Sequence, residues 1–377
     1  MKKDVCFVCV GQCGGNLGSL FVQKGYDVLF VNTAQSDLAL IKNAKHVYKI
    51  PGVSGCNQNS EKAQSVFAQY YDEIMSKVNS FVSKRIVYFI SSSSGGTSGM
   101  TPLMVEAFLN YLKEKEDKEW EIYDRECEEG KNPKSPVKRK AGFITVLPSI
   151  SETVVLNANS YNFMKQVGEL IDRERASEIS NLANLFLIDN ENCSDILKLN
   201  NDFVNLFDEV LRIPEKHKSV KGNVDPADLE EAITAIGLTV FSKLPKDDFS
   251  ISALVRSVRT SPIFAQTEET VGQYWVSSTT EELDSIALER ELGTPLTHYK
   301  TYNDSTNLFV FSGLNLPAER VGLIADRAEE STSVPFNQNA QLFQREVSVK
   351  SRVSEAVEQK PHDSIQSKLS AFKRRRS

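Results

Sequence analysis

The sequence has no long apolar run, and it has little tryptophan or histidine. No segment of its 377 residues approaches the roughly 20 consecutive apolar residues that a membrane-spanning helix requires. We therefore expect no membrane contact. The 4 histidines are far apart and show no metal-ligand spacing, so we expect His217, His298 and His362 to be surface residues.

Cysteine usage and net charge are those of an ordinary soluble protein. The six cysteines stand at positions 6, 9, 13, 56, 127 and 193. Cys6 and Cys9 have a Cys-x-x-Cys spacing, but residues three apart in a strand point to opposite faces, which argues against a metal site. A reduced, cytoplasmic protein is the simplest interpretation. The net charge of −6 favours solubility and argues against a chain that coats nucleic acid with its whole surface.

Length and composition indicate a large globular protein. A chain of 377 residues predicts two domains, or one large domain with appendages. Hydrophobic residues make up 40% and charged residues 25%, which is typical of soluble globular proteins.

A glycine-rich stretch, residues 10–18, organises the chain. It follows the apolar run 5–10, and an apolar run ended by glycines predicts a buried strand of a parallel sheet. A helix that begins there presents free N–H groups and the positive end of its dipole, which favours an anion such as phosphate. The spacing matches neither the dinucleotide fingerprint nor the Walker loop. A plain strand-to-helix turn is the alternative.

Further loops of this kind follow other predicted strands. Residues 26–31 form a second apolar run that ends in Asn32, and residues 51–57 form a loop of small residues. Residues 85–90 predict a third strand, which leads into the glycine–serine loop 91–99 and then a helix. Several such turns at one sheet edge indicate a polyphosphate site. Solvated turns or a flexible linker are the alternatives.

The remaining segments complete an alternating pattern. Residues 60–82 have helical periodicity, and the charge-rich residues 113–140 predict an exposed loop or helix extension. Residues 151–155 offer a hydroxyl and a carboxylate for a ribose, or a helix cap. A strand over 185–188 leads to Asn190, whose amide can both donate to and accept from a base.

Five motifs in order resemble the tubulin/FtsZ superfamily of GTPases. They are residues 10–14, 94–99, 151–155, 188–191 and 223–229. The second motif has Ser94 where the family has glycine, and Leu156 stands where tubulin has a glutamate. The mixture of tubulin-like and FtsZ-like motifs, with a long tail, most resembles the TubZ branch.

The resemblance implies a site for GTP or GDP with Mg²⁺. The metal would be held through the phosphates, with Gln12 as a candidate ligand. The implied nucleotide-binding residues come from the loops that follow the predicted strands: Gly11, Gln12, Cys13, Gly14, Asn16, Asn32, Gly55, Asn57, Ser94, Gly95, Gly96, Thr97, Ser98, Gly99, Glu152 and Asn190. Phe203, with Asn200 or Asn201, would lie near the base.

The acidic segment 223–228 has two interpretations. From spacing alone, Asp225 and Asp228 favour a helix N-terminus, and the helix would continue through residues 233–241. The resemblance instead implies catalytic Asp225, Asp228 and Asn223, which orient water and help place Mg²⁺ at the nucleotide of the next subunit. Such a shared site requires head-to-tail contacts, which make a filament.

The implied fold is α/β. A Rossmann-like parallel-sheet GTPase domain (1–195) is joined by a central helix and loop (196–222) to a smaller α/β activation domain (223–315). A C-terminal helix and a partly disordered basic tail (316–377) follow.

The implied function is a filament-forming GTPase that segregates plasmid or phage DNA in a bacterial or phage-infected cell. The cations Lys373, Arg374, Arg375 and Arg376 would bind a TubR-like adaptor on a centromere-like DNA site. The alternatives are an FtsZ-like division GTPase, a non-polymerising Rossmann-type oxidoreductase, and a nucleotide-binding scaffold without turnover.

Overall fold

The computed structural model describes residues 1–267 and 272–330. The predicted partner-binding residues 373–376 lie outside the described residues, as does His362. In the part of the chain that is described, no helix combines the length and apolar character needed to cross a bilayer.

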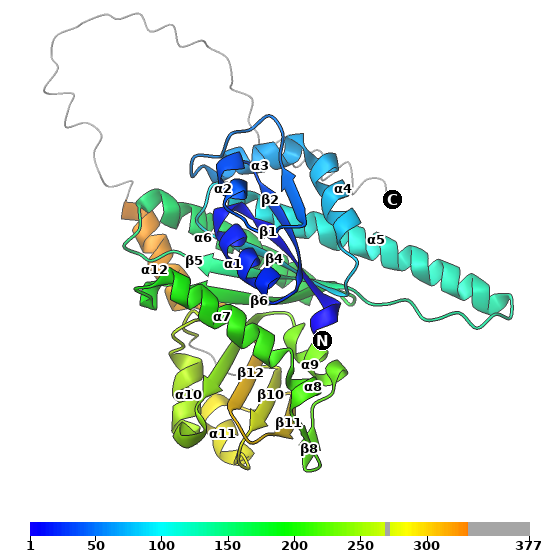
Figure 1. Ribbon diagram of the computed structural model, residues 1–377, viewed down its shortest axis with the longest axis vertical. Helices are drawn as coiled ribbons and strands as arrows, with labels where there is room; N and C mark the ends of the chain where they lie inside the picture. Colours follow the sequence, from blue (N-terminus) through cyan, green and yellow to red (C-terminus); the bar gives the residue numbers. More distant parts are fainter. Residues whose placement is uncertain (268–271, 331–377) are drawn as a thin grey trace, which may run out of the picture.

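A ten-stranded sheet runs through the molecule in the order β11-β10-β12-β9-β6-β5-β4-β1-β2-β3 (Figure 1). The parallel part contains β1 (Val5–Val10), β2 (Asp27–Asn32), β3 (His46–Lys49), β4 (Ile86–Ser92), β5 (Lys140–Leu147) and β6 (Leu182–Asp189). The mixed part contains β9 (Leu238–Leu244), β10 (Tyr274–Thr279), β11 (Thr297–Tyr302) and β12 (Asn307–Leu314), in which β12 runs antiparallel to β9 and β10. The predicted α/β class is confirmed.

Helices alternate with these strands. They are α1 (Gly11–Gln23), α2 (Gln35–Ala39), α3 (Ser60–Gln69), α4 (Tyr71–Phe81), α5 (Thr101–Glu128), α6 (Val154–Arg175), α7 (Ile196–Val210), α8 (Ile213–Lys216), α9 (Pro226–Ile233), α10 (Ile251–Arg259), α11 (Ser285–Leu292) and α12 (Ala318–Glu329). A short hairpin, β7 (Lys218–Ser219) and β8 (Gly222–Asn223), precedes α9.

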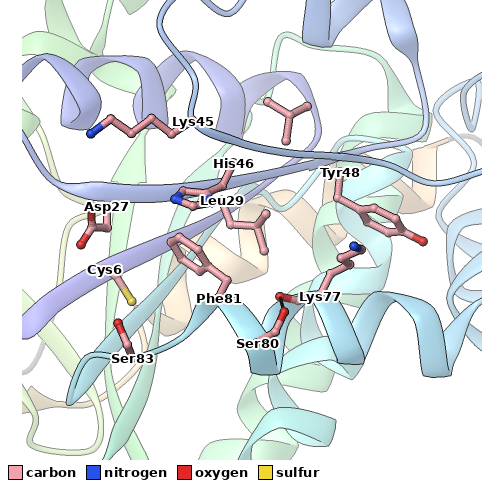
Figure 2. A pocket seen from close by; sticks show the side chains of 11 residues that line it. Cys6, Asp27, Leu29, Lys45, His46, Tyr48, Lys77, Ser80, Phe81 and Ser83 are labelled. Atoms are coloured by element: carbon pink, nitrogen blue, oxygen red, sulfur yellow. Dashed lines mark hydrogen bonds between the residues drawn. The ribbon is translucent and has the colours of Figure 1, made fainter.

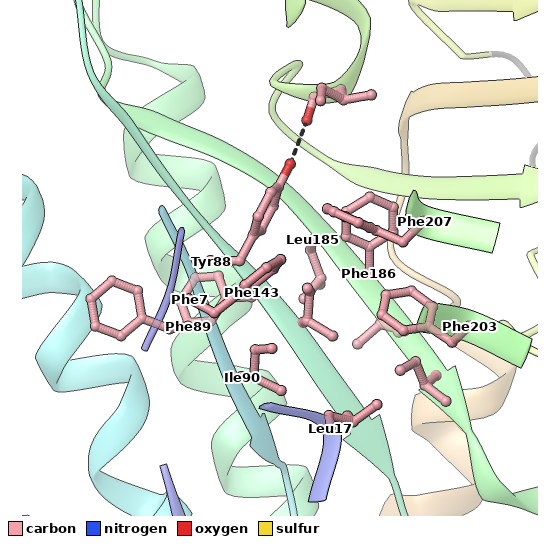
Figure 3. Packing of buried hydrophobic residues seen from close by; sticks show 14 of the residues in the cluster. Phe7, Leu17, Tyr88, Phe89, Ile90, Phe143, Leu185, Phe186, Phe203 and Phe207 are labelled. Carbon is pink, nitrogen blue, oxygen red and sulfur yellow. Dashed lines mark hydrogen bonds between the residues drawn. The ribbon is translucent and has the colours of Figure 1, made fainter. Parts of the chain in front are cut away.

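The core is built on both faces of the parallel strands, which explains their uninterrupted apolar sequences. On one face Phe7 of β1 stacks on Phe21 of α1, with ring centroids 3.9 Å apart. Phe7 also meets Phe207 of α7 edge-on, with ring centroids 5.8 Å apart; both rings are labelled in Figure 3. On the other face Phe89 of β4 packs on Phe108 of α5 at 5.6 Å. Such aromatic pairs add roughly 0.5–1.5 kcal/mol each beyond their buried area.

The two parts of the sheet meet between β6 and β9. Their pairing is limited to Leu185 and Leu238, and the amide of Leu185 also donates to the carbonyl of Gly237. Helix α7 lies across this junction, because Phe207 contacts both Phe7 of β1 and Phe241 of β9. The sequence predicts a central helix here. The domain boundaries drawn from it remain a prediction.

The helical periodicity predicted for residues 60–82 is confirmed, whereas the helix predicted after the acidic segment was wrong in extent. Residues 60–82 form two helices, α3 and α4, separated at Tyr70, whose backbone (φ −109°, ψ 25°) is not helical. The helix after the acidic segment ends at Ile233, and residues 238–244 form β9 instead. Gly237, with φ +133°, redirects the chain between them, in a conformation that side-chain-bearing residues rarely adopt.

The charge-rich segment is a helix extension, as predicted. Helix α5 continues past its last well-buried residue, Glu116, and projects far beyond the body with the loop that returns to β5 (Figure 1). We call residues 117–139 the arm. Its base is fixed by Glu116, whose Oε1 accepts from the amide of Arg139 (2.7 Å) and from Asn181 Nδ2 (2.9 Å).

Candidate functional site

The glycine-rich loops meet at the carboxyl edge of the parallel strands. A Cβ on Gly11, which follows β1, would lie 3.5 Å from Cβ of Thr97, in the loop after β4. The hydroxyl of Thr97 is 2.8 Å from that of Thr33, which follows β2. Thr33 Oγ1 in turn lies 3.8 Å from Sγ of Cys56, in the loop after β3. Four loops are thus brought together, as parallel strands with adjacent carboxyl ends predict.

Helix α1 begins at this meeting point without a side-chain cap. Its N-cap residue is Val10, which cannot accept a hydrogen bond from the first turn. Gly11 has φ +72°, and a Cβ on Gly14 would lie only 2.4 Å from the carbonyl oxygen of Ile90. The glycines therefore let the helix start directly against the strands, with its free N–H groups available to an anion. Gln12 and Asn16 are exposed on the first turns.

The loop after β4 is held mainly by its own serines. Ser92 Oγ accepts from the amide of Gly95 (3.0 Å), and the buried Ser98 donates to the carbonyl of Gly95 (2.8 Å). A Cβ on Gly96 would lie 2.8 Å from the amide nitrogen of Gln58, and one on Gly99 would lie 2.6 Å from Cβ of Ser60. The glycines thus allow this loop to pack on residues 58–60. The Ser98 hydroxyl is used inside the loop.

Asn159 of α6 joins these loops, and no sequence motif marks it as a site residue. Its Nδ2 donates to the carbonyls of Gln58 (2.7 Å) and Ser94 (3.1 Å), and its Oδ1 accepts from Ser60 (2.9 Å). A buried amide with all of these partners fixes the loop after β3 to the loop after β4.

Asn32, Gly55 and Asn57, which were also predicted to bind the nucleotide, shape the turns that follow β2 and β3. The buried Asn32 closes its own turn, because its Oδ1 accepts from Ala34 and its Nδ2 donates to Asp37. Gly55 and the exposed Asn57 have φ of +104° and +51°, so the turn after β3 needs left-handed backbone at both.

Cys13, at the start of α1, and Glu152, just before α6, both have raised pKa values. Burial raises the pKa of the Cys13 thiol to about 12, with a further contribution from the charge of Glu152. Burial also raises the pKa of Glu152. The cap of α6 is the hydroxyl of Thr153, which accepts from Leu156, and Ser151 lies before it, bonded to Ser149.

The end of β6 combines a structural ion pair with a free amide oxygen. Asp189 pairs with Arg320 of α12, and these side chains are 2% and 6% exposed. Glu191 accepts from the amide of Ile150 (2.7 Å). Between them, Asn190 has a buried Oδ1 without a hydrogen-bond partner among the described residues, and Asn200 of α7 has another.

The expectation that Phe203 lies near a base was wrong. Its ring is fully buried among Phe21, Phe186 and Phe264, with centroid distances of 5.9–6.4 Å. It belongs to the core between α7 and the sheet and has no free face for a ligand.

The acidic segment lies at the opposite edge of the sheet. Arg85, just before β4, binds Glu230 of α9 (2.7 Å), and Tyr88 Oη, further along β4, donates to the carbonyl of Ile233 (3.0 Å). The start of α9 at Asp225 therefore points away from the glycine loops, which follow the carboxyl end of β4. A strand of seven residues spans roughly 23 Å, so the two groups do not meet within one subunit.

Asp225 and Asp228 form the predicted helix start. Asp225 Oδ1 accepts from the amides of Ala227 (2.7 Å) and Asp228 (2.9 Å), and Asp228 Oδ2 accepts from the amide of Asp225 (3.0 Å). This is a capping box. Asn223 and Asp225 are exposed at this edge.

Two histidines predicted to be surface residues are largely buried. His217 Nδ1 lies 2.7 Å from Ser278 Oγ, and His298 Nε2 lies 2.9 Å from Ser277 Oγ. Burial lowers the pKa of His298 to about 3. No set of three or more His, Cys, Asp or Glu side chains within residues 1–267 and 272–330 is arranged to hold a metal.

A separate cavity of about 540 Å³ lies beside the edge strand β3 (Figure 2). It is lined by Asp27 and His46, at the starts of β2 and β3, and by Lys77 and Phe81 of α4. None of the predicted site residues lines it. The cavity therefore does not belong to the glycine-loop site.

Comparison with known proteins gives relatives over most of the chain, although no family model matches it. It is 28% identical over 335 residues to the tubulin-like protein TubZ of Clostridium botulinum C phage, which covers 88% of this chain and 84% of that protein. The crystal structure of TubZ from Clostridium botulinum phage c-st is similar, with a TM-score of 0.70, 26% identity and coverage of 88% and 99% of the two chains. A GTPγS-form protofilament of TubZ from Bacillus thuringiensis serovar israelensis has a similar fold, with a TM-score of 0.68, 17% identity and coverage of 90% and 94%.

Proposed function

We propose that this chain, a member of the TubZ branch of the tubulin/FtsZ superfamily, is a GTPase that polymerises head to tail and hydrolyses GTP between subunits. One subunit holds the nucleotide with its glycine loops. The next subunit supplies Asp225, Asp228 and Asn223 from its opposite edge. The domain division at residues 195, 222 and 315 forms part of this proposal.

The observation that carries the proposal is the separation of the two groups of residues. The uncapped start of α1 and the loop after β4 lie at the carboxyl edge of the sheet, and α9 is bound at the amino edge through Glu230 and Arg85. Only translation of one subunit onto another brings these edges together. Such a heterologous contact does not close on itself, so it produces a filament.

The donor set of the glycine-loop site fits a nucleoside triphosphate. The free N–H groups of α1 suit phosphate, and the unpartnered Oδ1 atoms of Asn190 and Asn200 can accept from the amino and imino groups of guanine. When bound with the nucleotide, Mg²⁺ would neutralise phosphate charge, with the exposed Gln12 as its candidate side-chain ligand. The chain's own carboxylates then orient the attacking water.

The TubZ relatives and the basic tail support a proposed cellular role. We propose that the filament segregates plasmid or phage DNA, and that residues 373–376 bind a DNA-bound adaptor by their charge. Deletion of residues 360–377 is expected to leave polymerisation unchanged and to weaken adaptor binding, measured by co-sedimentation. Unchanged adaptor binding would remove the tail from this role.

The concentration dependence of hydrolysis tests the shared site. The GTP turnover per molecule is expected to rise steeply at the protein concentration at which filaments sediment, because each site needs two subunits. Electron microscopy with GTP, ATP and a slowly hydrolysed analogue should show filaments with the guanine nucleotides. A turnover per molecule that stays flat across this concentration would contradict the proposal, as would bound nicotinamide detected by absorbance.

A further inference from the structure

A short basic hairpin stands immediately before the acidic segment. Strands β7 and β8 pair Lys218 with Asn223 and Ser219 with Gly222, and Val220 at the turn is 106% exposed. Among the described residues Lys218 makes no ion pair. The hairpin projects from the body at the end that carries α8 and β11 (Figure 1).

The base of this hairpin is fixed although its turn is exposed. The buried hydroxyl of Thr301 on β11 lies 2.8 Å from the carbonyl of His217 and 3.1 Å from that of Gly222. A Cβ on Gly222 would lie 2.8 Å from the carbonyl oxygen of Lys300, so the hairpin is pressed closely against β11. Its side chains therefore have a defined position relative to α9.

Lys218 shares the exposed face of the proposed catalytic residues. Directly paired residues of an antiparallel hairpin place their side chains on the same face, so Lys218 lies beside Asn223. Successive side chains of an extended chain point to opposite faces. Val224 is buried and Asp225 is exposed, so the side chain of Asp225 lies on the same face as that of Asn223. The face therefore carries one cation next to the carboxylate expected to enter the neighbouring site.

The negative charge of the acidic segment suggests a function for the positive charge of Lys218. Asp225 and Asp228 would approach a triphosphate of the same sign, and Glu231 lies on the next turn of α9, bonded to Tyr274 and Tyr299. Bringing such a surface to the nucleotide is unfavourable unless positive charge arrives with it. In phosphoryl transfer, positive charge placed at the γ-phosphate is a main source of rate acceleration.

We propose that Lys218 of one subunit contacts the terminal phosphates of the nucleotide in the next subunit and is a catalytic residue there; this rests on the proposed function. The oxygen of water adds to the γ-phosphorus while the bond to the bridging oxygen of the β-phosphate breaks, which gives GDP and inorganic phosphate. The proton released by the water passes to phosphate or the medium. Lys218 stabilises the oxygens on which negative charge develops.

Substitutions in the hairpin test this role on the full-length chain. Lys218→Gln is expected to lower GTP turnover per polymerised subunit by at least about tenfold, while Lys218→Arg keeps most of it. GTP affinity below the polymerising concentration should not change, because Lys218 does not touch the nucleotide of its own subunit. Lys221→Gln, which removes an equal charge from the turn, is the matched control and should hydrolyse GTP normally.

The outcomes separate this inference from the proposed function. If wild-type turnover rises with polymerisation but Lys218→Gln polymers hydrolyse GTP at the wild-type rate, Lys218 has no catalytic role and the shared site stands. An equal loss of turnover in Lys218→Gln and Lys221→Gln would indicate a general charge effect and would also overturn the assignment. If wild-type turnover does not depend on polymerisation, the proposed function itself fails.

Discussion

Arg320 of α12 and Asp189 at the end of β6 form a buried ion pair, with Nε and Oδ2 2.7 Å apart. Arg320 also donates to the second oxygen of Asp189 and to the carbonyl of Pro148, the residue that follows β5. One guanidinium therefore fixes α12 to the ends of two central strands. Asn190, the proposed base-reading residue, is the next residue after Asp189.

Removal of this guanidinium should destabilise the protein strongly. Arg320→Met leaves the Asp189 carboxylate buried without its partner, which typically costs about 3–5 kcal/mol. The free energy of unfolding in urea measures this, and GTP affinity should fall with it because Asn190 loses its support. Arg173→Met is the control, since Arg173 is half exposed and its pair with Glu106 should contribute about 1 kcal/mol or less. A change of similar size in both variants would contradict the prediction.

A methyl group on Gly14 should disrupt the start of α1. Gly14→Ala places a carbon 2.4 Å from the carbonyl oxygen of Ile90, so the backbone must move, and such overpacking typically costs about 1–3 kcal/mol. Both the midpoint of thermal unfolding and the affinity for GTP should therefore be lower in Gly14→Ala than in the wild type. Gly322→Ala, at a position in α12 with nothing within 4 Å, should be neutral or more stable by about 0.5–1 kcal/mol. A Gly14→Ala protein with normal stability and affinity would contradict the close approach.

Two substitutions of Asp225 separate its capping role from its catalytic role. Asp225→Asn keeps an oxygen that can accept from the amides of Ala227 and Asp228, whereas Asp225→Ala removes the cap at a cost of about 0.5–2 kcal/mol. Only the alanine variant should be less stable, but both should lose GTP turnover while still forming filaments. Normal hydrolysis by Asp225→Asn would assign this residue to the helix cap alone.

His298 should make stability depend on pH. Burial holds the pKa of its ring at about 3, below the ordinary value near 6.5 of an unfolded histidine. The unfolded chain therefore binds a proton first, and the contribution of His298 is complete above about pH 6.5 and is lost as the pH falls towards 3. Linkage gives a loss of about 2 kcal/mol at pH 5.

Urea unfolding at pH 7.5 and pH 5 checks this effect. His298→Gln, which cannot be protonated, should show a smaller loss of stability between the two pH values than the wild type. An unchanged pH dependence in His298→Gln would show that burial of this ring does not carry the effect.

The glycine loops could be predicted because their signals are local. An apolar run followed by small residues marks both the strand and the turn, and the turn residues Gly11 and Gly55 do adopt the left-handed backbone that glycine favours. The end of α9 was missed because apolar residues continue across Gly237 into β9. One glycine, rather than a change of hydrophobic pattern, separates that helix from that strand.

The supports of the site could not be predicted in this way. Asn159 binds the carbonyl of Gln58, 101 residues away, and Arg320 binds Asp189, 131 residues away. In sequence each is a polar residue on an amphipathic helix, where a solvated side chain is the usual outcome. The burial of His217 and His298 was not predicted for the same reason. Their hydrogen-bond partners, Ser278 and Ser277, lie on β10, far from either histidine in the sequence.

The arm has a consequence for any polymer of this chain. With 28 residues, α5 is about 42 Å long, and its outer part carries Trp120 and Tyr123 packed on each other away from the core. A filament of subunits stacked by translation would carry one arm per subunit, with every arm on the same side. Two such filaments could then pack side by side only through the surfaces that do not carry the arm. The arm therefore makes the two sides of the filament different.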